Sequence, residues 1–443
     1  MKTRLKVPFI MLLMVLVLFT SVITKPITIS AEVDVQAKTA ILVDAESGKI
    51  LFEKDADVAL PPASMTKMMT EYLVLEAIKE GKISWDTTTQ ITDYPYSISA
   101  DPAFSGVGLK QNKDYTVREL YEAMAINSDN ATTIALAELV AGSEGDFVKM
   151  MNDKADELGL PDATFVNSTG LSNTDLGENV PKGTEPNADN LMSARSAALL
   201  AYRLINDHPD ALEVSSMTTT EFEGDRIENL NWMLPEMPGY LSQFGYEGMD
   251  GLKTGWTDLA GYCFTGTAER DSQRLISVVM KTDSKEARFE ETRKLLDYGF
   301  NQFEKKELYP KAYQIEDKKT VPVTKGKEDT VQIASNAPLT TMIEKGTEDQ
   351  YSVEYKLDQS ALNDEGELTA PIKKGQQVGS VTLVNSEKNY GYITADGEQN
   401  ESVELVTTDK VEKSNWFMLM IGAITGFFAD IFTSVVDTVK GWF

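Results

Sequence analysis

The order of strand-like and helix-like segments is the feature that most constrains the fold of this chain. Two β-rich runs at residues 40–44 and 49–53 are joined by Ala-Glu-Ser-Gly, a pattern that predicts a hairpin. Two more β-rich runs follow much later, at 261–268 and 274–281, and a helical pattern covers about 285–303. Because strand signals lie at both ends of the segment and helix signals lie between them, we predict an antiparallel sheet covered by helices, with a helical insertion.

Helix signals mark the interior of this segment. Pro61-Pro62 opens a helical pattern that continues to about Glu80 and stops at Gly81. Thr116-Val117-Arg118-Glu119 is a capping box, in which the Thr and Glu side chains satisfy free backbone N–H groups at a helix start. Further helical patterns cover residues 131–141, 147–158 and 193–206. We therefore expect the insertion to consist of several short helices.

The residue pattern of the sequence changes near Glu307. From there on helical patterns stop, and short Val/Thr/Tyr runs alternate with Gly and Lys-Gly turns. We predict that these runs are strands of a small all-β domain. They lie at 320–324, 330–334, 350–357, 377–384 and 389–394. The predicted fold class is α+β, with an α+β domain over 32–306 and an all-β domain over 307–408.

The N-terminus has the composition of a secretory signal peptide, which we assign to residues 1–31. Basic residues up to Lys6 are followed by an apolar run from Val7 to about Ile23. We expect cleavage after Ala31, with Ala37 as the alternative site, and an uncleaved anchor helix as the alternative structure. No cysteine lies near the cleavage region, which excludes a lipoprotein. The rest of the chain is therefore expected outside the cytoplasm.

The C-terminal segment 409–443 is predicted to hold an amphipathic helix. Its uncharged run ends at Asp430 and is shorter than the ~20 apolar residues that span a bilayer. At helical spacing, one side carries Asp430, Thr433, Ser434, Asp437 and Lys440, and the other carries Phe428, Ile431, Phe432, Val435, Val439 and Trp442. Such a helix suits the membrane interface, and the alternative is packing on the protein's own core. We expect peripheral attachment to the outer face of the cell membrane.

Composition excludes several classes of function. The formal charge of −27, from 42 Lys+Arg against 69 Asp+Glu, argues against a nucleic-acid partner. The chain has one cysteine, Cys263, and one histidine, His208, so an internal disulfide and the common structural zinc sites are excluded. A Ser-His-Asp triad would have to use His208, which lies at a predicted helix end before a Pro and is interpreted as an ordinary surface residue. We expect no metal and no cofactor.

Three short motifs carry the chemistry. They are Ser64-Met65-Thr66-Lys67, Ser128-Asp129-Asn130 and Lys253-Thr254-Gly255, and each pattern occurs once in the chain. Each alone is a weak signal, because Ser64 fits an ordinary helix start and the other two fit polar turns. All three in this order and at these separations are a strong signal of one site.

The first motif predicts a serine nucleophile that is activated by a lysine. Ser64 is expected in the first turn of its helix, and residues three apart share a helix face, so Lys67 would lie beside its hydroxyl. A serine hydroxyl needs a base to take its proton, and a lysine serves when burial and neighbouring cations lower its pKa. The helix N-terminus also offers N–H groups to a developing oxyanion.

The other two motifs supply groups that hold a peptide substrate. Ser128 would relay a proton to the leaving amine, and the Asn130 amide would hold Lys67 and a substrate amide. Lys253, at the start of a short β-run, would bind a substrate carboxylate, with Thr254 as a hydrogen-bond donor. Gly255 would let a substrate backbone approach and add as an extra strand.

On these motifs the chain resembles the low-molecular-mass penicillin-binding proteins that are D-alanyl-D-alanine carboxypeptidases, the penicillin-binding protein 5 type of Gram-positive bacilli. The matching stretches are 61–70, 125–131, 165–171 and 250–255, and the resemblance covers essentially the whole chain. It implies an acyl-enzyme on Ser64, peptidoglycan pentapeptides ending in D-Ala-D-Ala as substrates, and β-lactam antibiotics as covalent inhibitors.

The resemblance also assigns roles residue by residue. Lys67 would be the proton acceptor, Ser128 the second catalytic hydroxyl, and Lys253 the residue that binds the peptide carboxylate. The oxyanion hole would be the backbone N–H groups of Ser64 and Trp256. Trp256 is a departure, since some relatives carry His or a small residue there. Because only its backbone is required, we expect activity to survive, with differences in substrate preference, pH profile and deacylation rate.

Three alternative functions remain open at this point. A D,D-endopeptidase would use the same site on peptidoglycan cross-links. A class A β-lactamase would need a Glu-x-x-Leu-Asn loop after Ser128, and no such motif is present. A non-catalytic wall-binding module is disfavoured by the intact Ser64, Lys67 and Lys253.

Overall fold

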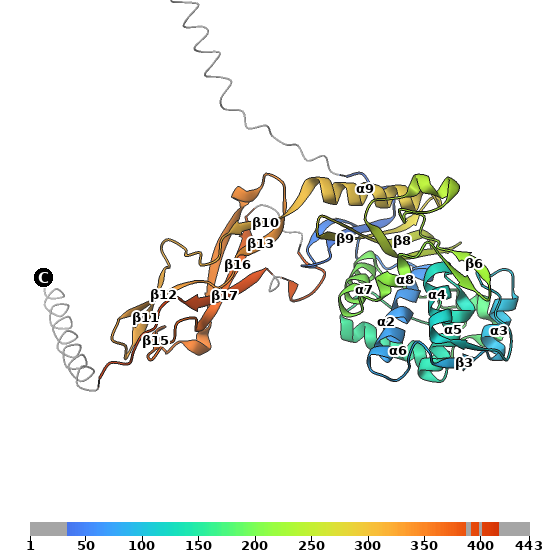
Figure 1. Ribbon diagram of the computed structural model, residues 1–443, viewed down its shortest axis with the longest axis horizontal. Coiled ribbons are helices and arrows are strands. Elements are labelled where there is room, and N and C mark those ends of the chain that lie inside the picture. Colours follow the sequence, from blue (N-terminus) through green and yellow to red (C-terminus); the bar gives the residue numbers. More distant parts are fainter. Residues whose placement is uncertain (1–32, 387–390, 398–400, 416–443) are drawn as a thin grey trace, which may run out of the picture. The chain divides into compact units, whose positions relative to one another are not determined.

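The computed structural model describes residues 33–386, 391–397 and 401–415 (Figure 1). The predicted signal peptide, 1–31, lies outside these residues, as do residues 416–443, which hold the predicted C-terminal helix. Among the helices that are described, none combines the length and the apolar character that crossing a membrane requires.

A five-stranded antiparallel sheet is the centre of the first domain, and its order is β2-β1-β9-β8-β7. Its strands are β1 (Thr39–Asp44), β2 (Ile50–Lys54), β7 (Met249–Thr257), β8 (Gly261–Arg270) and β9 (Gln273–Thr282). The sheet confirms that strands from both ends of the segment pair, since Leu42 of β1 lies opposite Ser277 of β9. Strand β7 forms an edge and begins at Met249, so Lys253 lies in its middle and not at its start.

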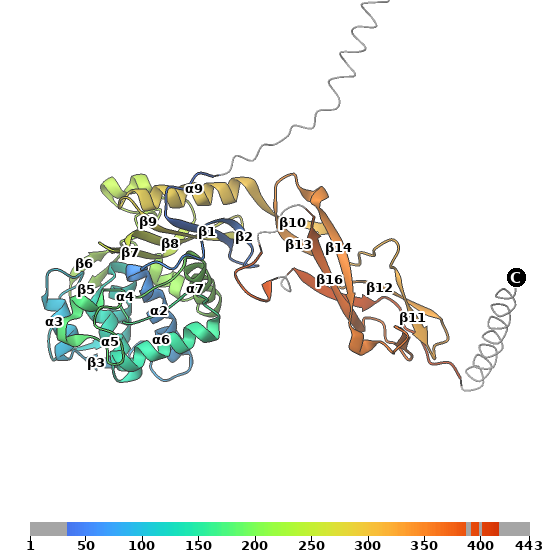
Figure 2. The ribbon, with the colours of Figure 1, turned by 180° about the vertical axis from the view of Figure 1, so that it is seen from behind.

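Helices cover both faces of this sheet. Figures 1 and 2 show α9 (Ala287–Gln302) along one face and most of the helical insertion against the other, while Phe244 of the insertion packs on Phe289 of α9. The insertion contains η1 (Ala63–Thr66), α2 (Lys67–Lys79), α3 (Asp93–Ala100), α4 (Val117–Asn127), α5 (Asn130–Ala141), α6 (Glu144–Leu158), η2 (Asn173–Asn179), α7 (Ala194–Asp207), α8 (Ala211–Ser215) and η3 (Gly239–Phe244). Two small antiparallel strand pairs lie among them: β3 (Thr88–Gln90) with β4 (Asp114–Thr116), which are separated by α3, and the hairpin of β5 (Thr219–Phe222) with β6 (Asp225–Glu228). The predicted architecture is confirmed.

Burial explains why the insertion holds its shape. Helix α2 is buried over ten of its 13 residues, so it is a central core helix with little polar face. The predicted capping box is present, because Thr116 Oγ1 accepts from the Glu119 N–H at 3.2 Å and the Glu119 carboxylate accepts from the Thr116 N–H at 2.8 Å. At the other end of this helix, Ser128 has φ 64° and ends α4 in the left-handed conformation.

The second domain is all-β, as predicted. A six-stranded sheet has the order β14-β16-β17-β12-β11-β15, and β10 pairs with β13 beside it. The strands are β10 (Phe303–Tyr309), β11 (Thr320–Thr324), β12 (Thr330–Ser335), β13 (Leu339–Glu344), β14 (Tyr351–Leu357), β15 (Leu368–Thr369), β16 (Gln377–Asn385) and β17 (Ser402–Thr407). The strand predicted at 389–394 is wrong in its described part, 391–394, which makes only an isolated bridge at Tyr392.

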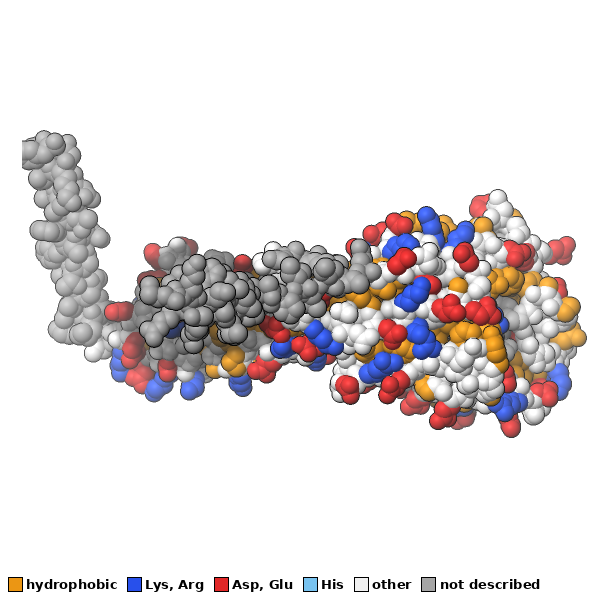
Figure 3. Space-filling view, turned by 90° about the horizontal axis from the view of Figure 1, so that it is seen from above, with side chains coloured by type: hydrophobic (Ala, Val, Ile, Leu, Met, Phe, Trp, Pro, Cys, Tyr) orange, Lys and Arg blue, Asp and Glu red, His pale blue; other side chains and the backbone are white. Residues whose placement is uncertain are grey.

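Acidic and basic side chains are interspersed on the described surface that is seen in Figure 3. A nucleic-acid site would gather Lys and Arg in one field, and the absence of such a partner stays a prediction from net charge.

Candidate active site

Ser64 is placed by a short 3₁₀ turn that runs directly into α2. The residue before it, Ala63, has φ 47°, a conformation that a non-glycine residue rarely adopts and that is often found at functional sites. Gly170 makes this turn possible, because a Cβ there would lie 1.9 Å from the Ala63 carbonyl oxygen. The loop that carries Gly170 therefore fixes the backbone that presents the Ser64 hydroxyl.

Lys67 lies beside Ser64, as its spacing predicts. Its Nζ is 3.0 Å from Ser64 Oγ, and it donates to Asn130 Oδ1 at 2.8 Å and to the Thr169 carbonyl at 2.9 Å. The side chain is completely buried. Burial, followed by the charge of Lys253, lowers the Lys67 pKa well below its ordinary value. The neutral amine can give its two N–H groups to the two fixed acceptors, which leaves its lone pair for the Ser64 hydroxyl.

The second motif lies on the turn between α4 and α5. Asp129 caps α5 by accepting from the Thr132 N–H at 2.6 Å, and its other oxygen accepts from the Val107 N–H at 2.5 Å. Asn130 Nδ2 donates to Ser105 Oγ at 3.1 Å, while its oxygen holds Lys67. Asp129 is thus the structural member of the motif. It holds the turn and the loop over Ser105 together.

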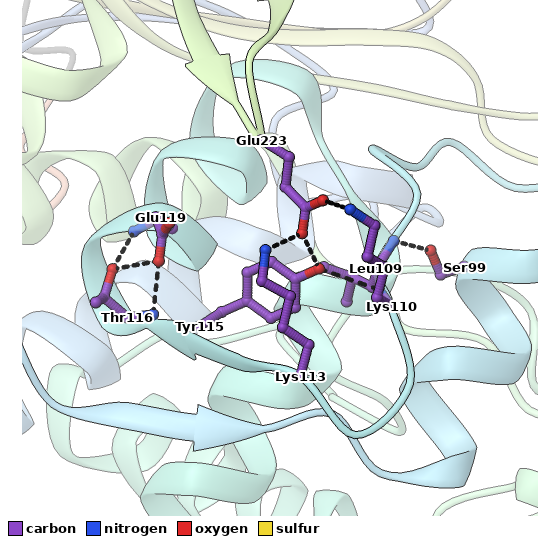
Figure 4. Close-up of polar contacts among 8 residues, drawn as sticks. All are labelled: Ser99, Leu109, Lys110, Lys113, Tyr115, Thr116, Glu119 and Glu223. Carbon is purple, nitrogen blue, oxygen red and sulfur yellow. Dashed lines mark hydrogen bonds and ion pairs between the residues drawn. The ribbon is translucent and has the colours of Figure 1, made fainter.

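The loop that carries Ser105 is fastened by a carboxylate from a distant hairpin. Figure 4 shows Glu223, at the tip of the β5–β6 hairpin, in contact with Lys110, Lys113 and the Tyr115 hydroxyl. The Lys113 Nζ lies 2.5 Å from the carboxylate. Hydrogen bonds from these three residues, the one from Lys110 first, lower the Glu223 pKa to about 2. The wall of the site that holds Ser105 is therefore tied to a hairpin more than a hundred residues away in sequence, as the separation of 110 between Lys113 and Glu223 shows.

The third motif lies on the edge strand β7. Lys253 and Thr254 are both buried, and burial lowers the Lys253 pKa to about 8. A Cβ on Gly255 would lie 2.4 Å from the Pro62 carbonyl oxygen. From the sequence we expected this glycine to allow the approach of a substrate backbone. The structure shows a constraint within the protein itself, because the turn before Ser64 packs directly on β7 and leaves no room for a side chain.

One cavity of about 340 Å³ gathers members of all three motifs. Its lining residues are Ser64, Ser105, Ser128, Leu230, Thr254, Gly255, Trp256, Tyr262, Lys285 and Arg288. Lys67 and Asn130 lie behind this wall through their contacts with Ser64 and Ser105. Trp256 is 52% exposed, and its ring lies 6.0 Å from that of Tyr262. The candidate residues predicted from sequence therefore converge on one place.

Arg288 is the residue of this cavity that sequence reasoning missed. It is buried near the start of α9, and its Nη1 donates to the Gly255 carbonyl at 3.3 Å. Within the described residues its Nε finds no hydrogen-bond partner. Burial lowers its pKa to about 10, which still leaves it charged at neutral pH. In sequence Arg288 is one arginine of a charged helix, so no local signal separates it from its neighbours.

His208 and Cys263 lie apart from this chemistry. His208 was interpreted as a surface residue, and that was wrong, because it is buried with its ring edge-on to Tyr72 at 4.7 Å. The sequence at a helix end before a Pro gives no sign that another helix, here α2 with Tyr72, covers the His208 side chain. Cys263 is a buried free thiol. Within the described part of the chain, no cluster of three or more His, Cys, Asp or Glu side chains is arranged to hold a metal ion.

Comparisons with known proteins assign both domains to described families. Residues 25–284 match the family Peptidase S11, D-alanyl-D-alanine carboxypeptidase, and residues 303–413 match the penicillin-binding protein 5 C-terminal domain. The D-alanyl-D-alanine carboxypeptidase DacF of Bacillus subtilis is 32% identical over 354 residues, covering 80% of this chain and 83% of that protein.

Two solved structures extend the comparison. A peptidoglycan synthesis regulatory factor (PBP3) from Streptococcus pneumoniae is 37% identical with a TM-score of 0.70, covering 85% of this chain and 99% of that one. Penicillin-binding protein D2 from Listeria monocytogenes, in its cefotaxime-bound form, is 34% identical with a TM-score of 0.52, covering 61% of this chain and 99% of that one. The chain therefore belongs to the peptidase S11 family of D-alanyl-D-alanine carboxypeptidases and has a C-terminal domain of the penicillin-binding protein 5 type.

Proposed function

We propose that this chain removes the terminal D-alanine from peptidoglycan pentapeptide stems through an acyl-enzyme on Ser64. The observation that carries the proposal is the placement of Lys67. Its amine lies 3.0 Å from Ser64 Oγ, and two further acceptors fix its direction. A buried lysine with a lowered pKa is a general base at neutral pH, which a solvated lysine is not.

Acylation follows from this arrangement. The neutral Lys67 amine takes the Ser64 proton as Ser64 Oγ bonds to the carbonyl carbon between the two D-alanines. The carbonyl oxygen becomes an oxyanion and accepts from the backbone N–H groups of Ser64 and Trp256. When the C–N bond breaks, the proton passes from Lys67 through the Ser128 hydroxyl to the leaving amine. D-Alanine departs and the ester on Ser64 remains.

Deacylation reverses the same proton path. Water replaces the leaving amine, gives one proton toward Lys67, and its oxygen bonds to the ester carbon. The ester bond between Ser64 Oγ and the acyl carbon then breaks, and Ser64 recovers its proton. The peptide stem leaves shortened by one residue. A β-lactam would acylate Ser64 in the same way.

Selectivity for a peptide that ends in a carboxylate comes from the cations around the cavity. Arg288 is buried and charged with an unpartnered Nε, and Lys253 and Thr254 lie on the adjacent strand. An uncompensated buried charge is costly, so an incoming carboxylate gains more here than at the surface. We therefore assign the carboxylate of the terminal D-alanine to Arg288, Lys253 and Thr254.

A D,D-endopeptidase acting on cross-links is the second candidate function, because the same nucleophile and base would serve either bond. Covalent labelling tests the shared chemistry. A fluorescent penicillin should label the wild type and leave Ser64→Ala unlabelled, and an unlabelled wild type would refute the acyl-enzyme. Release of D-alanine from N-acyl-Lys-D-Ala-D-Ala then separates a carboxypeptidase from a β-lactamase, and a cross-linked dimer as substrate measures endopeptidase activity.

We also propose that the protein acts outside the cytoplasm and is held on the outer face of the cell membrane by its C-terminal helix. The basic and apolar N-terminus and the amphipathic pattern after Asn415 support this location. The division into 1–31, 32–306, 307–408 and 409–443 is part of the same proposal. Deleting residues 415–443 should release the protein from membranes, and continued sedimentation with them would contradict the anchor.

A further inference from the structure

A third buried ionisable group lies close to the two active-site lysines. Glu71 is on α2, one helical turn after Lys67, and only 3% of its surface is exposed. No part of the three motifs includes it, and the proposed reaction gives it no task. A buried carboxylate is costly unless it is well compensated, so its presence needs a physical reason.

Hydrogen bonding does not supply that reason. Among the described residues the donor to the Glu71 carboxylate is the Tyr121 hydroxyl, at 3.4 Å. The other two buried carboxylates near Lys67 are better satisfied. Asp129 accepts from two backbone N–H groups, and Glu144 accepts from the Ser168 N–H at 2.9 Å and from the Ser168 and Tyr94 hydroxyls. Those two are held by structural donors, whereas Glu71 is left to the nearby positive charges.

The positive charges near Glu71 belong to the active site, because Lys67 lies one helical turn away on α2 and α2 packs on β7, the strand that carries the buried Lys253. Burial has the largest effect on the Glu71 pKa and raises it to about 7. The charge of Lys253, the Tyr121 hydrogen bond and the charge of Lys67 follow in that order, and each of them lowers it. In return, Glu71 is the leading opposite charge acting on Lys253. Lys67 responds more to Lys253 and Asp129 than to Glu71.

The remaining ionisable groups around this centre come from every side. They are Tyr121 on α4, Asp129 before α5, Glu144 on α6, Lys253 on β7 and Arg288 on α9. On the α7 side, Asp207 accepts from the Tyr72 hydroxyl at 3.0 Å and so pairs with a different residue of α2.

We infer that Glu71 is a positioning residue that sets the charge states of the two active-site lysines, since its buried carboxylate keeps Lys253 an ammonium while Lys67 remains a neutral amine. Two buried ammonium groups this close repel each other, so one of them must lose its proton unless a carboxylate offsets it. Glu71 acts mainly on Lys253 and selects which lysine keeps the charge. The inference rests on the proposed function, in which Lys67 is the base and Lys253 binds the carboxylate.

The pH dependence of acylation follows with a definite sign. Acylation is lost at low pH when Lys67 gains a proton, and at high pH when Lys253 loses one. Replacing Glu71 by Gln removes the negative charge that keeps the Lys253 pKa up, so the alkaline limb moves to lower pH. A nearby opposite charge is worth roughly one to two pKa units, and we expect a shift of about that size.

The test measures the second-order rate of acylation by a fluorescent penicillin from about pH 5 to about pH 10, a range that spans both lysines. The variants are Glu71→Gln, Glu71→Leu and Glu71→Asp. Gln and Leu remove the charge in two different ways, so both should show the shifted limb, and Asp should restore most of the wild-type profile. Glu76→Gln is the control, because Glu76 is on the same helix but pairs with Lys154 at 2.8 Å, and its profile should match the wild type.

The outcomes separate this inference from the proposed function. An alkaline limb in the charge-free variants that coincides with the wild-type limb would refute the role of Glu71, even though the site still acylates. A wild type that takes no label would refute the proposed function and the inference with it. Thermal unfolding of each variant excludes a merely structural effect, because a folding defect lowers the labelled fraction without moving the limb.

Discussion

Replacing Arg288 by Met should abolish most of the carboxypeptidase activity without destabilising the fold. Met keeps the length and apolar stem of the side chain and removes the guanidinium. Among the residues that the structure describes, that guanidinium donates to the Gly255 carbonyl at 3.3 Å and lies 4.7 Å from the centre of the Phe289 ring, and its Nε has no hydrogen-bond partner. Its removal therefore costs the fold little and takes away a buried charge, so Tm should stay the same or rise.

The magnitude of the activity loss comes from the hydrogen bonds that the substrate carboxylate would make. Hydrogen bonds to charged groups are worth about 1.5–3 kcal/mol each, and two of them to a carboxylate sum to at least about 3 kcal/mol. At 1.36 kcal/mol per factor of ten, kcat/KM for D-alanine release should fall about 100-fold or more. The assay is release of D-alanine from N-acyl-Lys-D-Ala-D-Ala, with thermal unfolding followed in parallel.

Arg293→Met is the matched control on the same helix. Arg293 donates to the Phe244 and Gly245 carbonyls at 2.7 and 3.0 Å, and it is not among the residues that line the cavity. This variant should lose stability and keep kcat/KM. If Arg288→Met keeps kcat/KM within about threefold of the wild type, the assignment of the carboxylate to Arg288 is wrong. If both variants lose stability and activity together, Arg288 acts through the fold and the reasoning fails as well.

Two further predictions concern the elements that shape the site. The pKa of Glu223 is lowered to about 2 from an ordinary 4.5, so its ion pairs stabilise the fold above pH 4.5 and are lost as pH falls toward 2. In Glu223→Gln, Tm should fall less than in the wild type as pH is lowered through that range. If Tm depends on pH in the same way in both proteins, the ion pairs of Glu223 do not hold the Ser105 loop. Gly170→Ala should lower Tm by several degrees and slow penicillin acylation, because its Cβ would meet the Ala63 carbonyl at 1.9 Å. Gly159→Ala is the control, because Gly159 has φ +73° with open space around it, so its Cβ adds backbone strain without a clash. If both variants slow acylation equally, Gly170 has no special role in placing Ser64.

Much of the fold was predictable because its signals are local. The 261–268 and 274–281 runs became β8 and β9, and the helix expected over 285–303 is α9. Strand β7 was recognised only in part, because its burial comes from η1 and α8 packing on it and not from its own alternation. The strand predicted at 389–394 shows the converse, a β-rich composition with no sheet partner in its described part beyond one bridge.

The placement of the candidate nucleophile and base was predictable for a different reason. Ser64 and Lys67 are three residues apart on one helix face, so their contact is a property of the sequence itself. Ser105 and Arg288 carry no such mark, since each reaches the site only through tertiary packing. Glu71 shares a helix face with Lys67, yet nothing in the sequence marks its burial. The same holds for Gly255, whose constraint is the Pro62 carbonyl nearly two hundred positions earlier in the chain.

Charge balance explains why these unmarked residues matter to a serine–lysine site. Three cations, Lys67, Lys253 and Arg288, are buried here with three carboxylates, Glu71, Asp129 and Glu144. Above the Glu71 pKa of about 7, a neutral Lys67 leaves two cations against three carboxylates, so the set carries one negative charge in excess. A substrate carboxylate at Arg288 and Lys253 adds a further negative charge and raises the pKa of Lys253, so binding secures the ammonium that holds it. Departure of D-alanine removes that charge again, and the free site returns to the state in which Glu71 alone supports Lys253. In the proposed function the motifs thus supply the groups that react, and in the inference drawn from Glu71 the packing around them decides which of those groups is charged.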